Sequence, residues 1–230
     1  MRKGLLLVFD GNDGSGKATQ SRLLAEYLNA KGVPAERVDF PAYDRNVFGT
    51  LIGECLSGRH GDFVNLDPKI ASTLYALDRF ESSDAIRKHL EAGTVVVADR
   101  FTSANQIHQG GKIADVEERK RFLSWLELIE HGVLGVPRPD AIFYLRVPLD
   151  ISLELLLQKR ASKNSSLDDG QKDTVEDDRA YLERSHETAT WLASHEPNWR
   201  VVDCEKDGTM RAREDIHGEI VQAVLALLKP

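Results

Sequence analysis

The sequence predicts an α/β fold in which a central parallel sheet of about five strands carries helices on both faces. Short apolar runs along the chain are continuous rather than alternating, which is typical of strands buried on both faces. Segments with helical periodicity separate these runs, and strands joined by helices form parallel sheets. The 230 residues contain no internal repeat and no flexible Gly/Ser linker, so we expect a single domain over 1–230.

Five short runs rich in aliphatic and β-branched residues are expected to form the strands. Pro41 ends the second run and Gly93 precedes the third, and such residues commonly bound strands. A stiff segment containing Pro137 and Pro139 precedes the fourth run. The runs are Leu5–Phe9, Val38–Phe40, Thr94–Ala98, Ala141–Leu145 and Arg200–Val202.

Apolar periodicity and end signals predict helices between the strands. Leu24 and Leu28 lie on one apolar stripe of the first helix, and Gly32 ends it. Asp67 and Pro68 open the second helix as an N-cap followed by proline at the first helical position. The helices are expected over Lys17–Lys31, Pro68–Glu91, Val116–His131, Ile151–Arg160, Thr174–Ser194 and Arg211–Leu228.

One polar segment interrupts this alternation. Ala161–Asp173 has Leu167 as its single large apolar residue. A polar stretch of this length inside a compact α/β domain is either disordered or a mobile functional loop. We favour the mobile loop.

Charge and cysteine content argue against several classes of protein. The chain has 30 Lys+Arg against 37 Asp+Glu, a net charge of −7, which disfavours binding to nucleic acid or to an anionic membrane. The apolar run after Lys3 is too short for a signal peptide, and nothing approaches the roughly 18 apolar residues of a membrane span. Cys55 and Cys204 are too few for a disulfide framework or a zinc site, so we expect reduced thiols and a cytoplasmic protein.

The most informative segment follows the first strand and has the spacing of a P-loop, Gly-x4-Gly-Lys. Glycines let the backbone N–H groups turn inward around an anion, and the next helix adds its positive end. Lys17 supplies a charge that reaches the transferring phosphates. We therefore expect a three-layer fold of the P-loop NTPase type that binds ATP. The segment reads Gly11-Asn12-Asp13-Gly14-Ser15-Gly16-Lys17-Ala18-Thr19.

Ala18 departs from this motif, which has Ser or Thr after the lysine as a ligand of Mg²⁺. Thr19 points about 100° away around the helix, so its hydroxyl cannot simply substitute. Either other groups and waters hold Mg²⁺, or phosphoryl transfer is weakened.

Asp99 and Arg100 follow the third strand, and ligands of doubly wound folds bind beyond the carboxyl ends of the strands. Asp99 fits an acid that organises Mg²⁺ and its waters, and Arg100 fits a bidentate clamp on an acceptor phosphate. The alternative is a surface ion pair.

Tyr75 and Arg79 lie four apart on a predicted helix and therefore share one face. They suit a flat base with carbonyl acceptors, and the alternative is a core tyrosine beside a solvated arginine.

Together these residues make the chain resemble the thymidylate kinases, which are nucleoside monophosphate kinases of the P-loop class. The resemblance covers nearly the whole chain and implies transfer of the ATP γ-phosphoryl group to dTMP with Mg²⁺, giving dTDP and ADP in a homodimer. A pyrimidine nucleotide kinase of different or broader specificity, and a nucleotide-binding protein with little turnover, are the alternatives. The most specific matching segments are Gly11–Lys17, Phe40-Pro41, Leu74–Arg79, Asp99-Arg100-Phe101 and Gly135–Asp140.

The resemblance also implies roles for single residues. It assigns acceptor binding to Asp13, Phe40, Tyr43, Tyr75, Arg79, Arg100, Asn105 and His108. Catalysis is assigned to Lys17, Asp13, Arg100 and Arg160, and metal binding to Asp13, Asp99 and Glu176. Where the family commonly has an aromatic ring near the sugar 2′ position this chain has His108, which leaves the exclusion of ribonucleotides open.

The segment 161–173 falls where the family has its lid. The family places a catalytic arginine in the P-loop or in the lid, but the P-loop position is Gly14 and 161–173 contains no arginine. Arg160 is our candidate for a donor-phosphate contact, because a lysine lacks the planar fork. Glu176 has a second interpretation, since Asp173 and Glu176 also form a capping box for the next helix.

Overall fold

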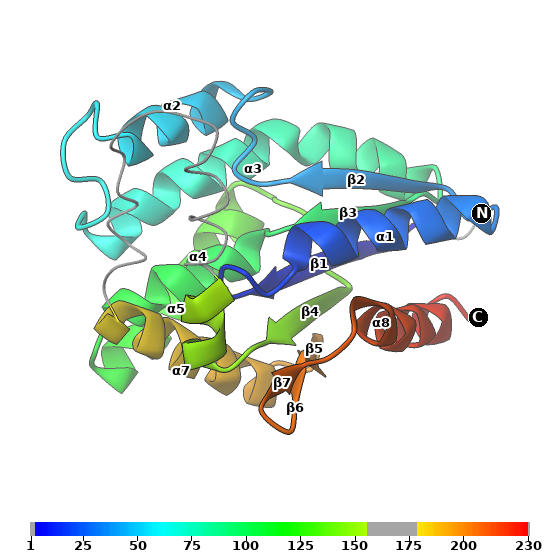
Figure 1. Cartoon of the computed structure of the whole chain (residues 1–230). Helices are drawn as coiled ribbons and strands as arrows, with labels where there is room; N and C mark the ends of the chain where they lie inside the picture. Colours follow the sequence, from blue (N-terminus) through cyan, green and yellow to red (C-terminus); the bar gives the residue numbers. More distant parts are fainter. Residues whose placement is uncertain (1–2, 156–178, 230) are drawn as a thin grey trace.

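The computed structural model describes residues 3–155 and 179–229 (Figure 1). The predicted lid over 161–173, Arg160 and Glu176 lie outside these residues. Within the described part, no helix combines the length and the apolar character that a membrane crossing requires.

A parallel sheet forms the centre of the fold, with strand order β2-β3-β1-β4-β5. Every neighbouring pair runs in the same direction, and Phe9 of the central strand lies between Asp99 and Phe143. The predicted fold class is therefore confirmed. The strands are β1 (Leu6–Gly11), β2 (Ala35–Asp39), β3 (Val95–Asp99), β4 (Ala141–Arg146) and β5 (Trp199–Asp203).

Helices connect the strands and cover both faces of the sheet (Figure 1). Within the described residues the labelled α-helices are α1 (Lys17–Ala30), α2 (Val47–Leu56), α3 (Pro68–Glu91), α4 (Thr102–His108), α5 (Val116–Glu127), α7 (Arg179–His195) and α8 (Arg213–Leu227). Residues 149–155 are also helical. A 3-10 turn, η1 (Gly110–Lys112), precedes α5, and a π-helical turn, η2 (Leu128–Val133), follows it. The strands β6 (Glu205–Lys206) and β7 (Thr209–Met210) form a small hairpin before α8.

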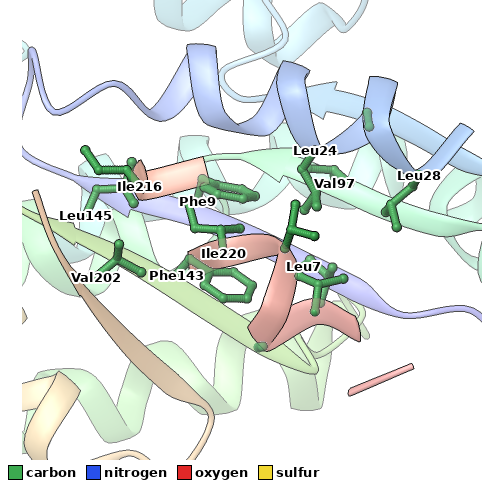
Figure 2. Close-up of a cluster of buried hydrophobic side chains, with 14 of the residues drawn as sticks. Leu7, Phe9, Leu24, Leu28, Val97, Phe143, Leu145, Val202, Ile216 and Ile220 are labelled. Atoms are coloured by element: carbon green, nitrogen blue, oxygen red, sulfur yellow. The ribbon is translucent and has the colours of Figure 1, made fainter. Parts of the chain in front are cut away.

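The continuous apolar run of β1 is buried on both faces, as its pattern predicts. Leu7 and Phe9 pack into a cluster with Leu24 of α1 and Ile220 of α8 (Figure 2). Val8 points to the opposite face, which α3, α4 and α7 cover. This double burial fixes the carboxyl edge of the sheet, where the site residues lie.

The end signals in the sequence predict the observed limits of α3. The Asp67 carboxylate accepts hydrogen bonds from the backbone N–H groups of Lys69 at 2.9 Å and Ile70 at 3.4 Å, so it is the N-cap that the sequence predicts. The helix predicted over Val116–His131 instead changes to the π-helical turn η2 at Leu128.

The helices α2 and α4 have no counterpart among the predicted elements. Gly49 and Gly53 lower the helix propensity of α2, but a Cβ on Gly49 would lie 2.2 Å from the carbonyl oxygen of Ala42. Close packing therefore requires glycine there. The short helix α4 is mainly polar, so hydrophobic periodicity does not reveal it.

Candidate active site

The loop between β1 and α1 has the backbone conformation of an anion-binding loop. Gly11, Gly14 and Gly16 have φ angles of 148°, 83° and 92°, in the region that favours glycine. A Cβ on Gly11 would lie 2.5 Å from the carbonyl oxygen of Leu145. The α1 N-terminus begins directly after Gly16 and faces this loop with its unpaired N–H groups. The hydroxyl of Ser15 is buried without a hydrogen-bond partner among the described residues, which fits a donor to a phosphate oxygen.

Lys17 lies inside this loop. Its Nζ donates to the carbonyl oxygens of Gly11 at 2.9 Å and Asn12 at 2.8 Å, and it lies 3.5 Å from Asp13 Oδ1. Burial lowers the pKa of Lys17, and the charge of Arg100 lowers it further. The nearby carboxylates raise this pKa but do not outweigh the two other effects. The ammonium group is therefore placed where oxygen atoms of a phosphate can replace the carbonyl acceptors.

Asp13 and Arg100 form an ion pair next to Lys17. Arg100 donates through Nη2 to Asp13 Oδ1 and lies 3.6 Å from Asp10 Oδ1. Burial favours the neutral acid, but the charges of Arg100 and Lys17 outweigh it and hold the pKa of Asp13 below its usual range. Arg100 has a φ angle of 63°, an uncommon conformation for a residue other than glycine. The carboxyl end of β3 is therefore strained in order to direct this guanidinium toward the loop.

Asp99, the last residue of β3, is paired with Arg37 rather than with Arg100. Arg37 donates through Nη2 to Asp99 Oδ2 at 3.0 Å, and burial raises the pKa of this carboxyl group. Asp10 is fully buried and accepts from the Gly11 N–H at 2.9 Å and the Ser103 hydroxyl at 2.7 Å. The pair of Asp99 and Arg100 is thus not the simple surface ion pair of the alternative interpretation.

The donor set fits a magnesium ion held mainly by phosphate oxygens and water. In kinases Mg²⁺ retains several waters and binds one or two carboxylates plus substrate phosphates. Asp99 uses Oδ2 for Arg37, so Oδ1 can accept from a metal-bound water, whereas Asp13 is already neutralised by two cations. Among the described residues no group of three or more His, Cys, Asp or Glu side chains suits a metal ion.

All eight predicted acceptor residues line one pocket, although they come from four separate segments of the chain. The pocket has a volume of about 210 Å³ and lies at the carboxyl end of the sheet, beside the P-loop. Phe40, Phe63 and Phe101 give it apolar walls, and the Tyr75 ring lies 5.8 Å from that of Phe63. The eight residues are Asp13, Phe40, Tyr43, Tyr75, Arg79, Arg100, Asn105 and His108.

Arg79 is neither solvated nor isolated. It is 2% exposed and donates through Nε and Nη2 to the two carboxylate oxygens of Glu130 at 2.7 and 2.8 Å. The Asn105 amide donates to Glu130 Oε1 at 2.9 Å and to the carbonyl oxygen of Ser72 at 3.1 Å. Two of the predicted base-binding side chains are thus fixed by one buried carboxylate.

His108 lies between Arg100 and Tyr181 of α7. Its Nε2 is 2.8 Å from Arg100 Nη1, and its Nδ1 is 3.0 Å from the Tyr181 hydroxyl. Arginine can only donate, so Nε2 accepts and the proton of the neutral imidazole lies on Nδ1. Burial, then the charge of Arg100, lowers the pKa of His108 to about 4. A neutral histidine therefore helps to orient the guanidinium of Arg100.

Sequence reasoning missed Glu130, Tyr181 and Asp10. A signal for Glu130 is present, because it follows Phe122 and Leu126 at intervals of four on the buried stripe of the predicted helix. A charged residue on such a stripe needs a buried partner. Asp10 directly follows the apolar run Leu5–Phe9, so it is a charged residue at the end of a buried strand and gives a similar signal. No local pattern marks Tyr181.

Comparison with known proteins gives one consistent family. The protein-family model described as thymidylate kinase matches residues 9–216. A thymidylate kinase of Mycobacterium tuberculosis (strain CDC 1551 / Oshkosh) is 29% identical over 206 residues, covering 88% of this chain and 93% of the relative. One of Pelotomaculum thermopropionicum is 30% identical over 234 residues, covering 98% and 95%. A solved thymidylate kinase from Candida albicans has the same fold, with a TM-score of 0.72 at 19% identity and coverage of 97% and 92%.

Proposed function

This chain belongs to the thymidylate kinase family, and from that membership we propose that it transfers the γ-phosphoryl group of ATP to dTMP, giving dTDP and ADP. The observation that carries the proposal is the single pocket lined by all eight predicted acceptor residues, with Asp13 of the P-loop in its wall. The donor and acceptor sites therefore meet at Asp13. We propose that one domain over 1–230 holds both.

Catalysis by this site is positioning and charge stabilisation, because phosphoryl transfer requires little covalent chemistry from the protein. The loop amides and Lys17 hold the donor phosphates, and Arg100 binds the acceptor phosphate from the other side of Asp13. His108 holds the Arg100 guanidinium in orientation. Mg²⁺ supplies further charge stabilisation when it is bound. Arg160 and Glu176 stay proposals from the sequence.

The test of this function is a panel of acceptors with ATP and Mg²⁺. Purified protein is supplied with dTMP, dUMP, UMP or dCMP, and ADP release is measured. We expect the highest kcat/KM with dTMP. Nucleotide binding without acceptor-dependent ADP release would contradict the kinase proposal and favour a binding protein.

A broader pyrimidine specificity is the second candidate, and His108 favours it. The imidazole is smaller and more polar than the aromatic ring that the resemblance places near the sugar 2′ position, and it is held between Arg100 and Tyr181. UMP turnover as fast as dTMP turnover would establish this candidate in place of a strict dTMP kinase.

Ala18→Thr is expected to lower the Mg²⁺ concentration for half-maximal turnover several-fold. The substitution adds an oxygen ligand at the position where the P-loop motif provides one. Mg²⁺ is titrated at saturating ATP and dTMP. Ala30→Thr, at the exposed far end of α1, is the matched control. An unchanged titration for Ala18→Thr would mean that the metal is held elsewhere.

We also propose a homodimer and a cytoplasmic location. The dimer follows from the family resemblance, and sedimentation of the purified protein tests it. The location is supported by the two cysteines, Cys55 and Cys204, which are both free thiols and buried.

A further inference from the structure

Glu130 has a buried carboxylate, and within the described part of the chain its three side-chain hydrogen bonds all come from Arg79 and Asn105, which line the acceptor pocket. Oε2 accepts from Arg79 Nε, and Oε1 accepts from both Arg79 Nη2 and Asn105 Nδ2. Glu130 is 1% exposed and does not itself line the pocket. It therefore acts on the pocket only through Arg79 and Asn105.

The contacts of Asn105 fix the orientation of its amide. Its two partners are the Glu130 carboxylate and the Ser72 carbonyl, and both can only accept hydrogen bonds. Only the NH₂ end of the amide can face them, so the Oδ1 end is turned toward the pocket that Asn105 lines. Glu130 also occupies Nε and Nη2 of Arg79, so Nη1 is the guanidinium nitrogen that this carboxylate leaves for the pocket.

Asn105 Oδ1 and Arg79 Nη1 thus place an acceptor beside a donor in this part of the pocket. This pattern complements a base edge with an N–H donor next to a carbonyl acceptor, as in thymine and uracil. Cytosine has the reverse pattern, a ring nitrogen that accepts next to an amino group that donates. A base of the wrong pattern would leave buried polar groups unpaired, which is strongly unfavourable.

We propose that Glu130 is the positioning residue that sets this donor–acceptor pattern and so excludes cytosine nucleotides from the acceptor pocket. The inference rests on the proposed function and assigns a determinant of its base specificity. The position of Glu130 depends on the π-helical turn η2, in which the backbone N–H of Leu134 bonds to the carbonyl oxygen of Ile129. A single π-helical turn inside a helical segment is uncommon and is frequently found at functional sites.

The test is Glu130→Gln, which retains the shape but makes one end of the side chain a donor. Arg79 donates to both carboxylate oxygens of Glu130, so in either orientation the NH₂ group of the new amide meets an N–H group of Arg79 and displaces the guanidinium. Arg79 Nη1 would then lose its position beside Asn105 Oδ1, and the pocket would lose the donor that complements a carbonyl group of the base. We expect the ratio of kcat/KM for dTMP to kcat/KM for dCMP to fall about tenfold or more. Calorimetric Kd values for the two nucleotides should change in the same direction.

Glu127→Gln is the matched control, because Glu127 lies at the exposed end of α5 and pairs with Arg138. Its dTMP:dCMP ratio should equal that of the unsubstituted protein. The double variant Arg79→Gln/Glu130→Gln removes both buried charges, so it leaves neither of them unpaired. It replaces Glu130→Gln in the experiment if that single variant fails to fold. It too should lose the preference for dTMP.

The outcomes separate this inference from the proposed function. If the unsubstituted protein releases no ADP with dTMP, the proposed function fails, and the Kd ratios still test the role of Glu130. If it turns over dTMP and a folded Glu130 variant retains the original ratio, Glu130 has only a structural role and the inference is overturned. A uniform loss of activity with both nucleotides would overturn it as well.

Discussion

Lys17→Ala is expected to reduce kcat by at least about 10³-fold while the fold remains intact. The substitution removes the single ammonium group inside the P-loop, and charge stabilisation of this kind contributes about 10²–10³ per donor, more for a buried cation. Single-turnover ADP release with dTMP measures the loss. ATP binding should weaken less than kcat, because the loop amides remain.

The stability of Lys17→Ala separates a catalytic lysine from a structural one. Burial lowers the pKa of Lys17 from 10.5, so the folded chain binds fewer protons at this group than the unfolded chain. Stability from this group therefore rises with pH toward 10.5, and at neutral pH the ammonium disfavours the folded state. We expect an unchanged or higher free energy of unfolding for Lys17→Ala in urea. Lys31→Ala, at the other end of α1, should retain full activity. Retained turnover by Lys17→Ala would show that the loop is not a phosphate site.

The strands could be predicted because burial on both faces produces continuous apolar runs, as in β1 and β3. The limits of α3 could be predicted because Asp67 and Gly93 are local signals at its two ends. In contrast, α2 contains Gly49, which its packing against Ala42 requires. Such a requirement comes from a tertiary contact, and local propensity cannot reveal it.

The site shows the same division between local and tertiary information. The P-loop residues are contiguous, so their spacing alone identifies them. Arg79 and Asn105 were assigned to the acceptor pocket by resemblance, but the carboxylate that fixes both comes from η2, far along the chain. Arg37, the partner of Asp99, is also remote in sequence. Partners of this kind are selected by the fold and leave little trace in any short window of sequence.

Arg100→Lys is expected to lower kcat/KM for dTMP by about 10²–10³-fold. The guanidinium of Arg100 bonds to Asp13 through Nη2 and to His108 through Nη1, so its plane is fixed beside the P-loop. A lysine retains the charge near Asp13 and Asp10 but cannot make two fixed contacts and bind an acceptor phosphate in a bidentate manner. Initial rates at varied dTMP and saturating ATP measure the effect, and KM for ATP should change much less.

The lysine variant is more informative than an alanine variant, because alanine would leave Asp10 buried without its nearby cation. Lysine and arginine are equally disfavoured at a φ angle of 63°, so the substitution leaves the backbone strain at the end of β3 unchanged. The unfolding free energy of Arg100→Lys should therefore differ little from that of the unsubstituted protein. Arg22→Lys, on the exposed face of α1 and paired with Glu26, is the matched control and should have full activity. If Arg100→Lys retained the kcat/KM for dTMP of the unsubstituted protein, a single positive charge would suffice at this position. The proposed bidentate binding of the acceptor phosphate by Arg100 would then be wrong.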